Sequence, residues 1–392
     1  MATSKKEEKK DSKKKTGSFF DAIKKMNEYA FVPTEKGLYD IENWCTTGIY
    51  GLNCIMSDAD IFKGTIDGKR YVIAGENSTA KTLLSLQIIA EFLKQDKNNK
   101  VVHFETEGAI LSQHMDEVGI DKNRIIFMPI AYIEEFRYQA VTVLDEYIER
   151  KKQGTEKGGL RIILDSLGML STMDENEKVV EDADTKSMTK PQLIASTFRL
   201  LAMRLAISKA SLITIQHVQN KTGGKKLPSY IEEKKTISGG ETFMYAGDVI
   251  IYLSKADEWE KETTTNDKGK ETKSAIKVGI RATAEVMKSR FMKDKVRMPL
   301  TILYGVGVLP HSGLLQLAIE AGVFVLKGSM YENTVNGIKF YKKEIAERPN
   351  EIYCKDTMNI MRDFIQAKYS LFTKANDDEI KNFTADEESH AD

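Results

Sequence analysis

The eight residues Gly75 to Thr82, which read Gly-Glu-Asn-Ser-Thr-Ala-Lys-Thr, constrain the fold of this chain more than any other segment. They follow the apolar run Tyr71-Val-Ile-Ala and precede a helical pattern in which Leu84, Ile88 and Phe92 lie four residues apart. A strand, a glycine-initiated loop and a helix in this order are typical of a phosphate-binding loop, in which backbone N–H groups and the helix N-terminus bind phosphate oxygens. The alternative is a turn of small polar residues that matches the pattern by chance. We predict a nucleoside triphosphate site on an α/β fold.

Two side chains of this loop have predicted roles of their own. Lys81 is expected to contribute positive charge to the β- and γ-phosphates, and the Thr82 hydroxyl to hold Mg²⁺ at the start of the helix. The usual pattern G-x-x-x-x-G-K-[ST] has a second glycine where this chain has Ala80. Because alanine at positive φ would cost about 1 kcal/mol, we infer ordinary φ and ψ angles there. The residues predicted to contact the nucleotide are Gly75, Glu76, Asn77, Ser78, Thr79, Ala80, Lys81 and Thr82.

The composition is that of a soluble globular protein. The 392 residues are 41% hydrophobic and 30% charged, and no apolar run approaches the roughly eighteen residues that a membrane span requires. The start of the chain lacks an apolar signal-peptide segment. The three cysteines, Cys45, Cys54 and Cys354, have neither metal-ligand spacing nor a disulfide pattern. We expect a reducing, cytoplasmic compartment.

Charge is uneven along the chain although the formal net charge is zero. Residues 1–16 are predicted to form a basic disordered tail and residues 379–392 an acidic one. A basic tail attracts polyanions and an acidic tail competes with them, whereas composition alone is equally compatible with tails that only maintain solubility. The charged residues are Lys5, Lys6, Lys9, Lys10, Lys13, Lys14 and Lys15 at one end, and Asp386, Glu387, Glu388 and Asp392 at the other.

Alternating strand and helix patterns predict a mostly parallel, twisted sheet covered on both faces. The clearest helix is Pro191 to Ser208, and strand-like runs beyond Asp248 predict an antiparallel extension with a polar turn from Thr263 to Lys270. Ser18 to Lys25 has the spacing of a short helix with an apolar stripe, for which the sequence does not specify a partner. Five strands are predicted at Tyr71 to Ala74, Val101 to Phe104, Arg161 to Leu164, Leu212 to Ile215 and Val249 to Leu253.

The predicted organisation has a central domain and two smaller segments. Residues 17–67 would form an N-terminal oligomerisation segment, residues 68–311 the nucleotide-binding core and residues 312–378 a small mixed α/β domain. Within the last, helical patterns run from Gly313 to Ala321 and from Thr357 to Tyr369.

Ligands of open α/β sheets bind beyond the carboxyl ends of the strands, so polar residues at these positions are candidates for the site. Asp165 follows the third strand, where it would help to hold Mg²⁺ rather than cap a helix. Glu105 and Glu107 follow the second, and we choose Glu107 as the base that activates water, although the residues alone hardly separate the two. His217 follows the fourth strand with Gln216; the pair would sense the γ-phosphate or would be ordinary polar residues at a strand end.

Two long polar segments follow the third and fourth strands. Val218 to Ser238 is rich in lysine, which suits contact with a nucleic-acid backbone, and its glycines allow it to reorder. Ser171 to Lys190 is acidic and is predicted to be a solvent-exposed loop. The DNA-binding residues predicted from the lysine-rich segment Val218 to Ser238 and from the two glycines after it are Lys221, Gly223, Gly224, Lys225, Lys226, Lys234, Lys235, Gly239 and Gly240.

The order of these features resembles the RecA recombinase family over roughly residues 40 to 325, and most closely its bacteriophage UvsX branch. The resemblance implies a RecA-like phosphate-loop core, with Val218 to Ser238 and Ser171 to Lys190 as DNA-binding loops. It also places His114 where a family tyrosine stacks on the adenine base. Lys288 and Arg290, within Met287-Lys-Ser-Arg, would correspond to basic residues that reach the neighbouring subunit's γ-phosphate. Leu111 replaces an acidic adenine contact, so base recognition is expected to be looser.

By this resemblance the protein is expected to be a DNA-dependent ATPase that uses ATP and Mg²⁺ and forms helical filaments on single-stranded DNA. It would pair that strand with homologous duplex DNA, with a single-strand-binding protein and a recombination mediator as further partners, in the host cytoplasm if the chain is of phage origin. The alternatives are a RecA-fold ring motor such as a helicase, a regulatory ATPase, or a scaffold that binds nucleotide only to assemble. Glu107 and Asp165 argue against the last, since a scaffold needs no hydrolytic carboxylates.

Overall fold

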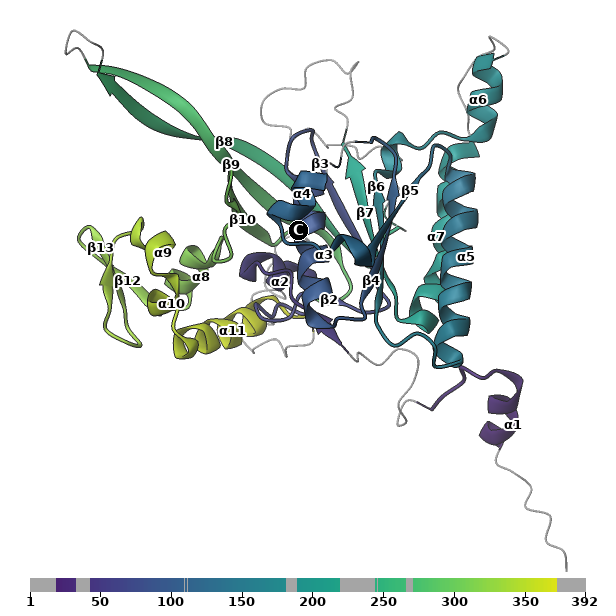
Figure 1. Ribbon diagram of the computed structural model, residues 1–392. Coiled ribbons are helices and arrows are strands. Elements are labelled where there is room, and N and C mark those ends of the chain that lie inside the picture. Colours follow the sequence, from purple (N-terminus) through teal and green to yellow (C-terminus); the bar gives the residue numbers. More distant parts are fainter. Residues whose placement is uncertain are drawn as a thin grey trace, which may run out of the picture. The chain divides into compact units, whose positions relative to one another are not determined.

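The computed structural model describes residues 19–32, 43–108, 110, 112–180, 189–218, 244, 246–265 and 271–371 (Figure 1). Two compact units are present, Met1–Glu42 and Asn43–Asp392. In the first, helix α1 (Phe19–Met26) confirms the short helix predicted at this place, and its apolar side chains Phe19, Phe20 and Met26 are exposed. None of the helices in the described ranges has the length and apolar character needed to cross a lipid bilayer.

The second unit is built on a nine-stranded sheet, which confirms the predicted α/β class. The strand order is β11-β10-β9-β8-β3-β7-β6-β4-β5, in which β3, β4, β5, β6, β7 and β8 are parallel and β9, β10 and β11 are antiparallel. The strands are β3 (Arg70–Gly75), β4 (Lys100–Glu105), β5 (Ile125–Pro129), β6 (Leu160–Asp165), β7 (Ser211–His217), β8 (Val249–Thr265), β9 (Glu271–Ser289), β10 (Arg297–Leu303) and β11 (Gly307–Val308).

Alternation along the strands divides the buried side chains between two faces. Ile73 of β3 joins a core with α2 (Tyr50–Met56) and α3 (Lys81–Gln95), while Val72 faces a core formed with α5 (Ile133–Lys152) and α7 (Thr189–Ser208). Helices α5 and α7 lie side by side over that second face (Figure 1). The predicted apolar face of α7 is buried as expected, and each such aliphatic or aromatic side chain contributes about 1.5–3 kcal/mol. Its members are Ile194, Phe198, Leu201 and Leu205.

Strand β8 differs from the prediction, because it pairs with β3 in parallel and only the strands after it are antiparallel. The backbone N–H of Asp248 donates to the Arg70 carbonyl oxygen at 2.8 Å, so the chain re-enters the sheet at the edge where β3 begins. The long connection after β7 is enough for this crossover. The polar turn predicted to start at Thr263 was also placed too early, since β8 continues to Thr265 through residues whose β-branched side chains favour strands.

The acidic segment from Ser171 to Lys190, predicted as a loop, instead contains helix α6 (Met173–Val180). Helix α7 begins at Thr189, within the last two residues of this segment. A capping box starts α6: the Glu175 N–H donates to Thr172 Oγ1, and the Thr172 N–H donates to Glu175 Oε2, both at 3.0 Å. Asp174 and Glu175 lie in the first turn, where the helix dipole favours negative charge. Capping and dipole compensation thus account for part of the acidity of this segment.

Short elements complete the unit. They are β1 (Trp44–Cys45), β2 (Thr65–Ile66), the 3-10 helices η1 (Lys122–Arg124) and η2 (Leu167–Met169), and α4 (Ser112–Glu117); after β11 follow α8 (Leu314–Glu320), β12 (Phe324–Lys327), β13 (Met330–Asn333), β14 (Lys339–Phe340), α9 (Glu344–Glu347), α10 (Pro349–Ile352) and α11 (Lys355–Tyr369). Helices α8 and α11 confirm the two helices predicted in the C-terminal part. Leu314, Phe324 and Met361 belong to the same buried cluster as α2 and α3, and a domain boundary at residue 312 stays a prediction.

One buried histidine gives the fold a pH dependence that can be measured. His103 on β4 is fully buried against Phe127, with ring centroids 4.9 Å apart, and its burial lowers its pKa to about 4. The imidazole is therefore neutral at pH 7, and its 3.8 Å approach to Glu105 is not an ion pair. The unfolded chain takes up this proton near pH 6.5, so the stability that neutral His103 provides is present above that pH and is lost as the pH falls toward 4.

We expect this loss to reach about 3 kcal/mol between pH 7 and pH 4, and to be absent in a His103→Phe variant, whose ring has no proton to bind. Denaturant unfolding of both proteins at a series of pH values measures the difference. Parallel stability curves for the two proteins would show that His103 does not contribute.

Candidate nucleotide site

The loop that is predicted to bind phosphate connects the end of β3 to the start of α3, as expected from the sequence. Gly75 cannot be replaced, because a Cβ atom there would lie 2.7 Å from the Leu253 carbonyl oxygen and 2.9 Å from Thr79 Oγ1. Thr79 is fully buried and donates its hydroxyl to the Glu76 carbonyl oxygen at 2.9 Å, which closes the loop on itself. Tyr252 of β8 donates its hydroxyl to Glu76 Oε1 at 3.3 Å and ties the loop to the neighbouring strand.

The prediction for Ala80 was wrong. Ala80 adopts φ 64° and ψ 27°, the left-handed conformation, and so does not stay in ordinary φ/ψ space; Ser78 also has positive φ, at 57°. At Ala80 the chain turns into α3, and its carbonyl oxygen accepts the Leu84 N–H at 3.0 Å. The Cβ atom makes this conformation cost an L-residue about 1–2 kcal/mol, so this chain carries strain where the usual pattern has glycine.

We expect Ala80→Gly to raise the free energy of unfolding by up to about 1 kcal/mol, because relief of this strain outweighs the greater freedom of glycine in the unfolded chain. Ala90→Gly is the control: Ala90 is a fully buried residue within helix α3, and the same change there should destabilise by at least about 0.5–1 kcal/mol. Chemical denaturation of the three proteins measures both effects. A loss of stability in Ala80→Gly equal to that in Ala90→Gly would contradict a strained loop.

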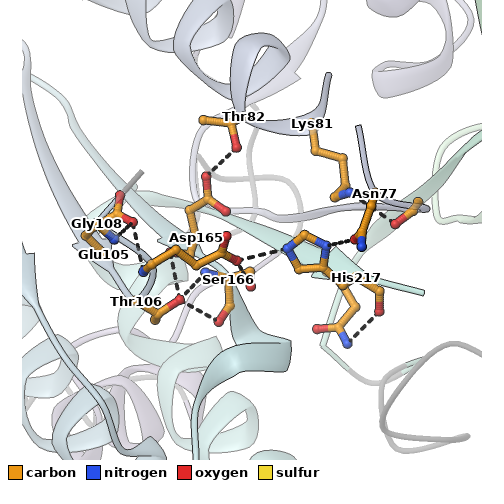
Figure 2. Close-up of polar contacts among 12 residues, drawn as sticks. Asn77, Lys81, Thr82, Glu105, Thr106, Gly108, Asp165, Ser166 and His217 are labelled. Carbon is orange, nitrogen blue, oxygen red and sulfur yellow. Dashed lines mark hydrogen bonds and ion pairs between the residues drawn. The ribbon is translucent and has the colours of Figure 1, made fainter. Parts of the chain in front are cut away.

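Lys81 is buried, and its ammonium group donates to two carbonyl oxygens of the loop, Gly75 at 3.1 Å and Glu76 at 2.7 Å (Figure 2). Burial lowers the pKa of Lys81 to about 8, and the nearby carboxylates of Asp165 and Glu107 oppose this. The group is thus held at the loop, still mostly charged at pH 7. A phosphate in the loop would offer it stronger, charge-assisted hydrogen bonds than these carbonyl groups.

Thr82 and Asp165 meet as predicted for a magnesium site. The Thr82 hydroxyl, on the first turn of α3, donates to Asp165 Oδ2 at 2.8 Å at the end of β6 (Figure 2). Burial raises the pKa of Asp165 to about 6, partly offset by the Thr82 hydrogen bond. In the described part of the chain no cluster of three or more histidine, cysteine or acidic residues could hold a metal. One carboxylate and one hydroxyl fit Mg²⁺, which prefers few protein oxygens together with water and phosphate.

The structure gives the two glutamates after β4 different surroundings. Glu105 Oε1 accepts the N–H groups of Glu107 at 3.0 Å and Gly108 at 2.9 Å, so it shapes the turn (Figure 2). Glu107 Oε1 accepts the Ser166 hydroxyl at 3.0 Å and lies 3.0 Å from His217 Nε2. Glu107 is therefore the glutamate whose carboxylate joins the other predicted site residues.

His217 bridges the loop and Glu107. Its Nδ1 lies 3.0 Å from Asn77 Oδ1 and its Nε2 lies 3.0 Å from Glu107 Oε1 (Figure 2). Gln216, the adjacent residue, is buried and donates to the His217 carbonyl oxygen at 3.2 Å. The side chains of Gln216 and His217 have different surroundings because neighbouring residues of a strand face opposite sides of the sheet. Of the two polar residues at this strand end, His217 is the one placed to respond to a change at the loop.

Many nucleotide-binding families share this set of residues at the ends of parallel strands: a loop, a lysine, a threonine–aspartate pair and a glutamate. Comparison with known proteins distinguishes among these families. The RecA N-terminal domain family matches residues 32–309. The chain belongs to this family. The match includes every site residue described so far, and it supports the resemblance drawn from the motifs.

Individual relatives are distant. A recombination and repair protein of Enterobacteria phage T4 is 24% identical over 265 residues, which are 67% of this chain and 60% of that protein. Protein RecA of Aquifex aeolicus is 24% identical over 294 residues, 74% of this chain and 76% of the relative. Protein RecA of Paracoccus denitrificans is 22% identical over 330 residues, 83% of this chain and 81% of the relative. The chain thus spans less than two thirds of the T4 protein's length.

The basic pair predicted from the RecA resemblance lies at the other edge of the sheet. Lys288 pairs with Ile250 at the start of β8, beside the start of β3, whereas the phosphate loop follows the end of β3. At about 3.3 Å per residue, the six-residue strand separates the two edges by about 17 Å. Lys288 and Arg290 therefore do not join the phosphate loop of their own chain.

Both cations have partners where they lie. The Lys288 ammonium group donates to the carbonyl oxygens of Met244 at 2.5 Å and Gly247 at 3.0 Å. Arg290 Nε lies 2.9 Å from Asp248 Oδ1, and most of the arginine side chain is exposed. The two residues that would complete a RecA site are thus anchored to the segment that leads into β8.

The remaining predicted residues are placed only in part. His114 lies on α4, shortly after the Glu107 turn, and is half-buried; its contact with adenine stays a prediction. Leu111 lies outside the described residues. The predicted DNA-binding residues also lie outside them: Lys221, Gly223, Gly224, Lys225, Lys226, Lys234, Lys235, Gly239 and Gly240.

Sequence reasoning missed two residues that organise the site. Thr106 Oγ1 accepts the Ser166 N–H at 2.8 Å and donates to the Asp165 carbonyl oxygen at 3.1 Å, which joins the ends of β4 and β6. Ser166 in turn donates its hydroxyl to Glu107. The signal was present, because each is a small hydroxyl residue directly beside a predicted carboxylate at the end of a strand.

Proposed function

We propose that this protein is a DNA-dependent ATPase and recombinase, which assembles on single-stranded DNA as a helical filament and pairs that strand with homologous duplex DNA. The proposal is supported by the positions of two groups of residues that the RecA resemblance assigns to one site. The phosphate loop, Asp165 and Glu107 lie at one edge, and the basic pair lies at the other. A head-to-tail assembly brings the second edge of one subunit to the first edge of the next.

The residues at the first edge have complementary tasks. The loop N–H groups and Lys81 would bind the phosphates of ATP, and Thr82 with Asp165 would hold Mg²⁺, which when bound neutralises phosphate charge. The Ser166 hydroxyl, which donates to Glu107, and His217 Nε2, which lies 3.0 Å from it, hold the Glu107 carboxylate beside the loop. From that position Glu107 would accept a proton from the water that attacks the γ-phosphate.

His217 would couple the state of the nucleotide to DNA binding. It contacts Asn77 in the loop and Glu107 in the site, and it ends the strand from which the lysine-rich segment 218–238 departs. A γ-phosphate that changes the Asn77 contact would therefore move the first residue of that segment. The lysines of the segment would neutralise DNA phosphates, as their sequence predicts.

Lys288 and Arg290 would act in the neighbouring subunit's site. Their charge would stabilise the phosphoryl group during transfer, the role of an arginine finger. A subunit alone would then hydrolyse ATP slowly, and filament formation on DNA would switch hydrolysis on. The relatives' names, Protein RecA and recombination and repair protein, support this function. Single-strand-binding and mediator proteins, and a host cytoplasmic setting, belong to the same proposal.

The test is ATP hydrolysis by the purified protein with and without single-stranded DNA. The proposal expects strong stimulation by DNA and little hydrolysis in its absence. A rate that is unchanged by DNA would overturn it and favour a regulatory ATPase that does not act on DNA.

A further inference from the structure

Asp248, the residue directly before β8, accepts several hydrogen bonds at the basic edge of the sheet. Its carboxylate is only 10% exposed and accepts from the Arg70 backbone N–H at 3.0 Å, Arg70 Nε at 3.2 Å and Arg70 Nη2 at 3.0 Å. Arg290 Nε adds a fourth contact at 2.9 Å. The Asp248 N–H donates back to the Arg70 carbonyl oxygen, so backbone and side chain of Asp248 are both tied to β3.

This arrangement holds the carboxylate in one orientation. Arg70 uses both carboxylate oxygens, Oδ2 through its N–H and Nε and Oδ1 through Nη2, and such forked pairing fixes the plane of the group. Arg290 contacts Oδ1 of the carboxylate that Arg70 orients. The Arg290 side chain itself is 61% exposed, so most of it is surrounded by solvent.

The charges around Asp248 explain why the contact stays ionic. Burial acts to raise the pKa of Asp248, but hydrogen bonds and charge from Arg70, and then the charge of Arg290, outweigh it and leave the pKa below its ordinary value. Lys69 and Lys288 lie close enough to be affected by the same charges. The Asp248 carboxylate is thus surrounded by more positive than negative groups at this edge of the sheet, and such an excess of positive charge favours contact with phosphate.

An exposed arginine samples many rotamers, and fixing it costs up to about 2 kcal/mol of conformational entropy. A tether that restricts Arg290 before it meets the neighbouring phosphates lowers that cost, and misplacement of a catalytic group by about 1 Å can cost about 10²-fold in rate. We propose that Asp248 is a positioning residue for the neighbouring subunit's site, and that it does so by holding Arg290 at the edge of the sheet. This inference rests on the proposed function.

The experiment compares Asp248→Asn with wild type for DNA-stimulated ATP hydrolysis, DNA binding and thermal unfolding. Asparagine keeps the shape but removes the charge that holds Arg290. We expect kcat to fall about 10-fold or more with little change in the KM for ATP, and Asp248→Glu to recover part of the rate. Glu285→Gln is the matched control, because it removes another carboxylate–arginine contact of β9, with Arg297 at 2.9 Å, away from Arg290.

Two further measurements separate positioning from structural support. Asp248→Asn added to Arg290→Ala should cause little further loss, because the tether has nothing left to hold. In mixed filaments, Asp248→Asn subunits should regain hydrolysis when Glu107→Gln subunits supply an intact Arg290. An unchanged kcat, a faster rate, full additivity or no recovery on mixing would each overturn the inference. If wild-type hydrolysis did not respond to DNA, the proposed function itself would fail instead.

Discussion

Replacing Arg290 by alanine should lower DNA-stimulated ATP hydrolysis roughly 10³-fold or more, the range found when arginine fingers are removed from related phosphoryl-transfer sites. The variant keeps the phosphate loop, Asp165 and Glu107, so its affinity for ATP and for DNA should change little. Arg297→Ala is the matched control. It also removes an exposed arginine near this edge of the sheet, but this arginine contacts Glu285 rather than Asp248. Steady-state hydrolysis on single-stranded DNA measures both.

Mixing two inactive variants tests whether Arg290 acts on the neighbour. Arg290→Ala subunits keep an intact Glu107, and Glu107→Gln subunits keep an intact Arg290. In an equal mixture, about a quarter of the contacts between subunits join two intact halves, so about a quarter of the wild-type rate should return. A mixture as inactive as its components would show that Arg290 does not complete the next subunit's site.

The second large effect is expected for Glu107→Gln. The amide has the size of the carboxylate but cannot accept the proton of the attacking water, so hydrolysis should fall on the order of 10³-fold. DNA binding and thermal stability should remain close to wild type, since the amide oxygen of the new side chain can still accept the Ser166 hydroxyl.

Glu105→Gln is a stringent control for this choice of base. Its amide oxygen can still accept the N–H groups of Glu107 and Gly108 that Glu105 Oε1 accepts in the structure. Hydrolysis should therefore stay within a few-fold of wild type. A greater loss in Glu105→Gln than in Glu107→Gln would reverse the assignment.

The chemistry-bearing positions could be predicted because strand ends are local features of sequence. Asp165, Glu107 and His217 each follow an apolar run rich in β-branched residues. Because ligands bind at the carboxyl edge of a parallel sheet, the three residues are expected to lie close together. The same rule did not rank Glu107 above Glu105. That ranking depends on which side chain the turn uses to bind its own N–H groups, and only three-dimensional geometry shows it.

Other features depended on the whole fold. The left-handed angles at Ala80 follow from the path of the loop into α3 and override the preference of alanine. The parallel pairing of β8 depends on the crossover before it, which strand patterns do not record. The Thr172 and Glu175 capping box was present in the sequence and was overlooked, because the acidity of the segment was interpreted as solvent exposure.

The contacts of Asp248 show the opposite limit of sequence reasoning. Arg70 and Asp248 are 178 residues apart, and neither forms part of a motif. Their pairing arises because β3 and β8 are neighbours in the sheet. The resemblance to RecA indicated Lys288 and Arg290 as a pair, but the group that holds Arg290 could be found only from the structure.

Strand exchange tests the proposed recombinase function most directly. The protein, with ATP, Mg²⁺ and a single strand, is given labelled duplex DNA that is either homologous or unrelated to that strand. We expect the labelled strand to be displaced, and a new duplex to form, only with homologous DNA and only with ATP. Strand separation that does not require homology would identify a motor, and ATP hydrolysis on DNA without any exchanged product would contradict the recombinase function.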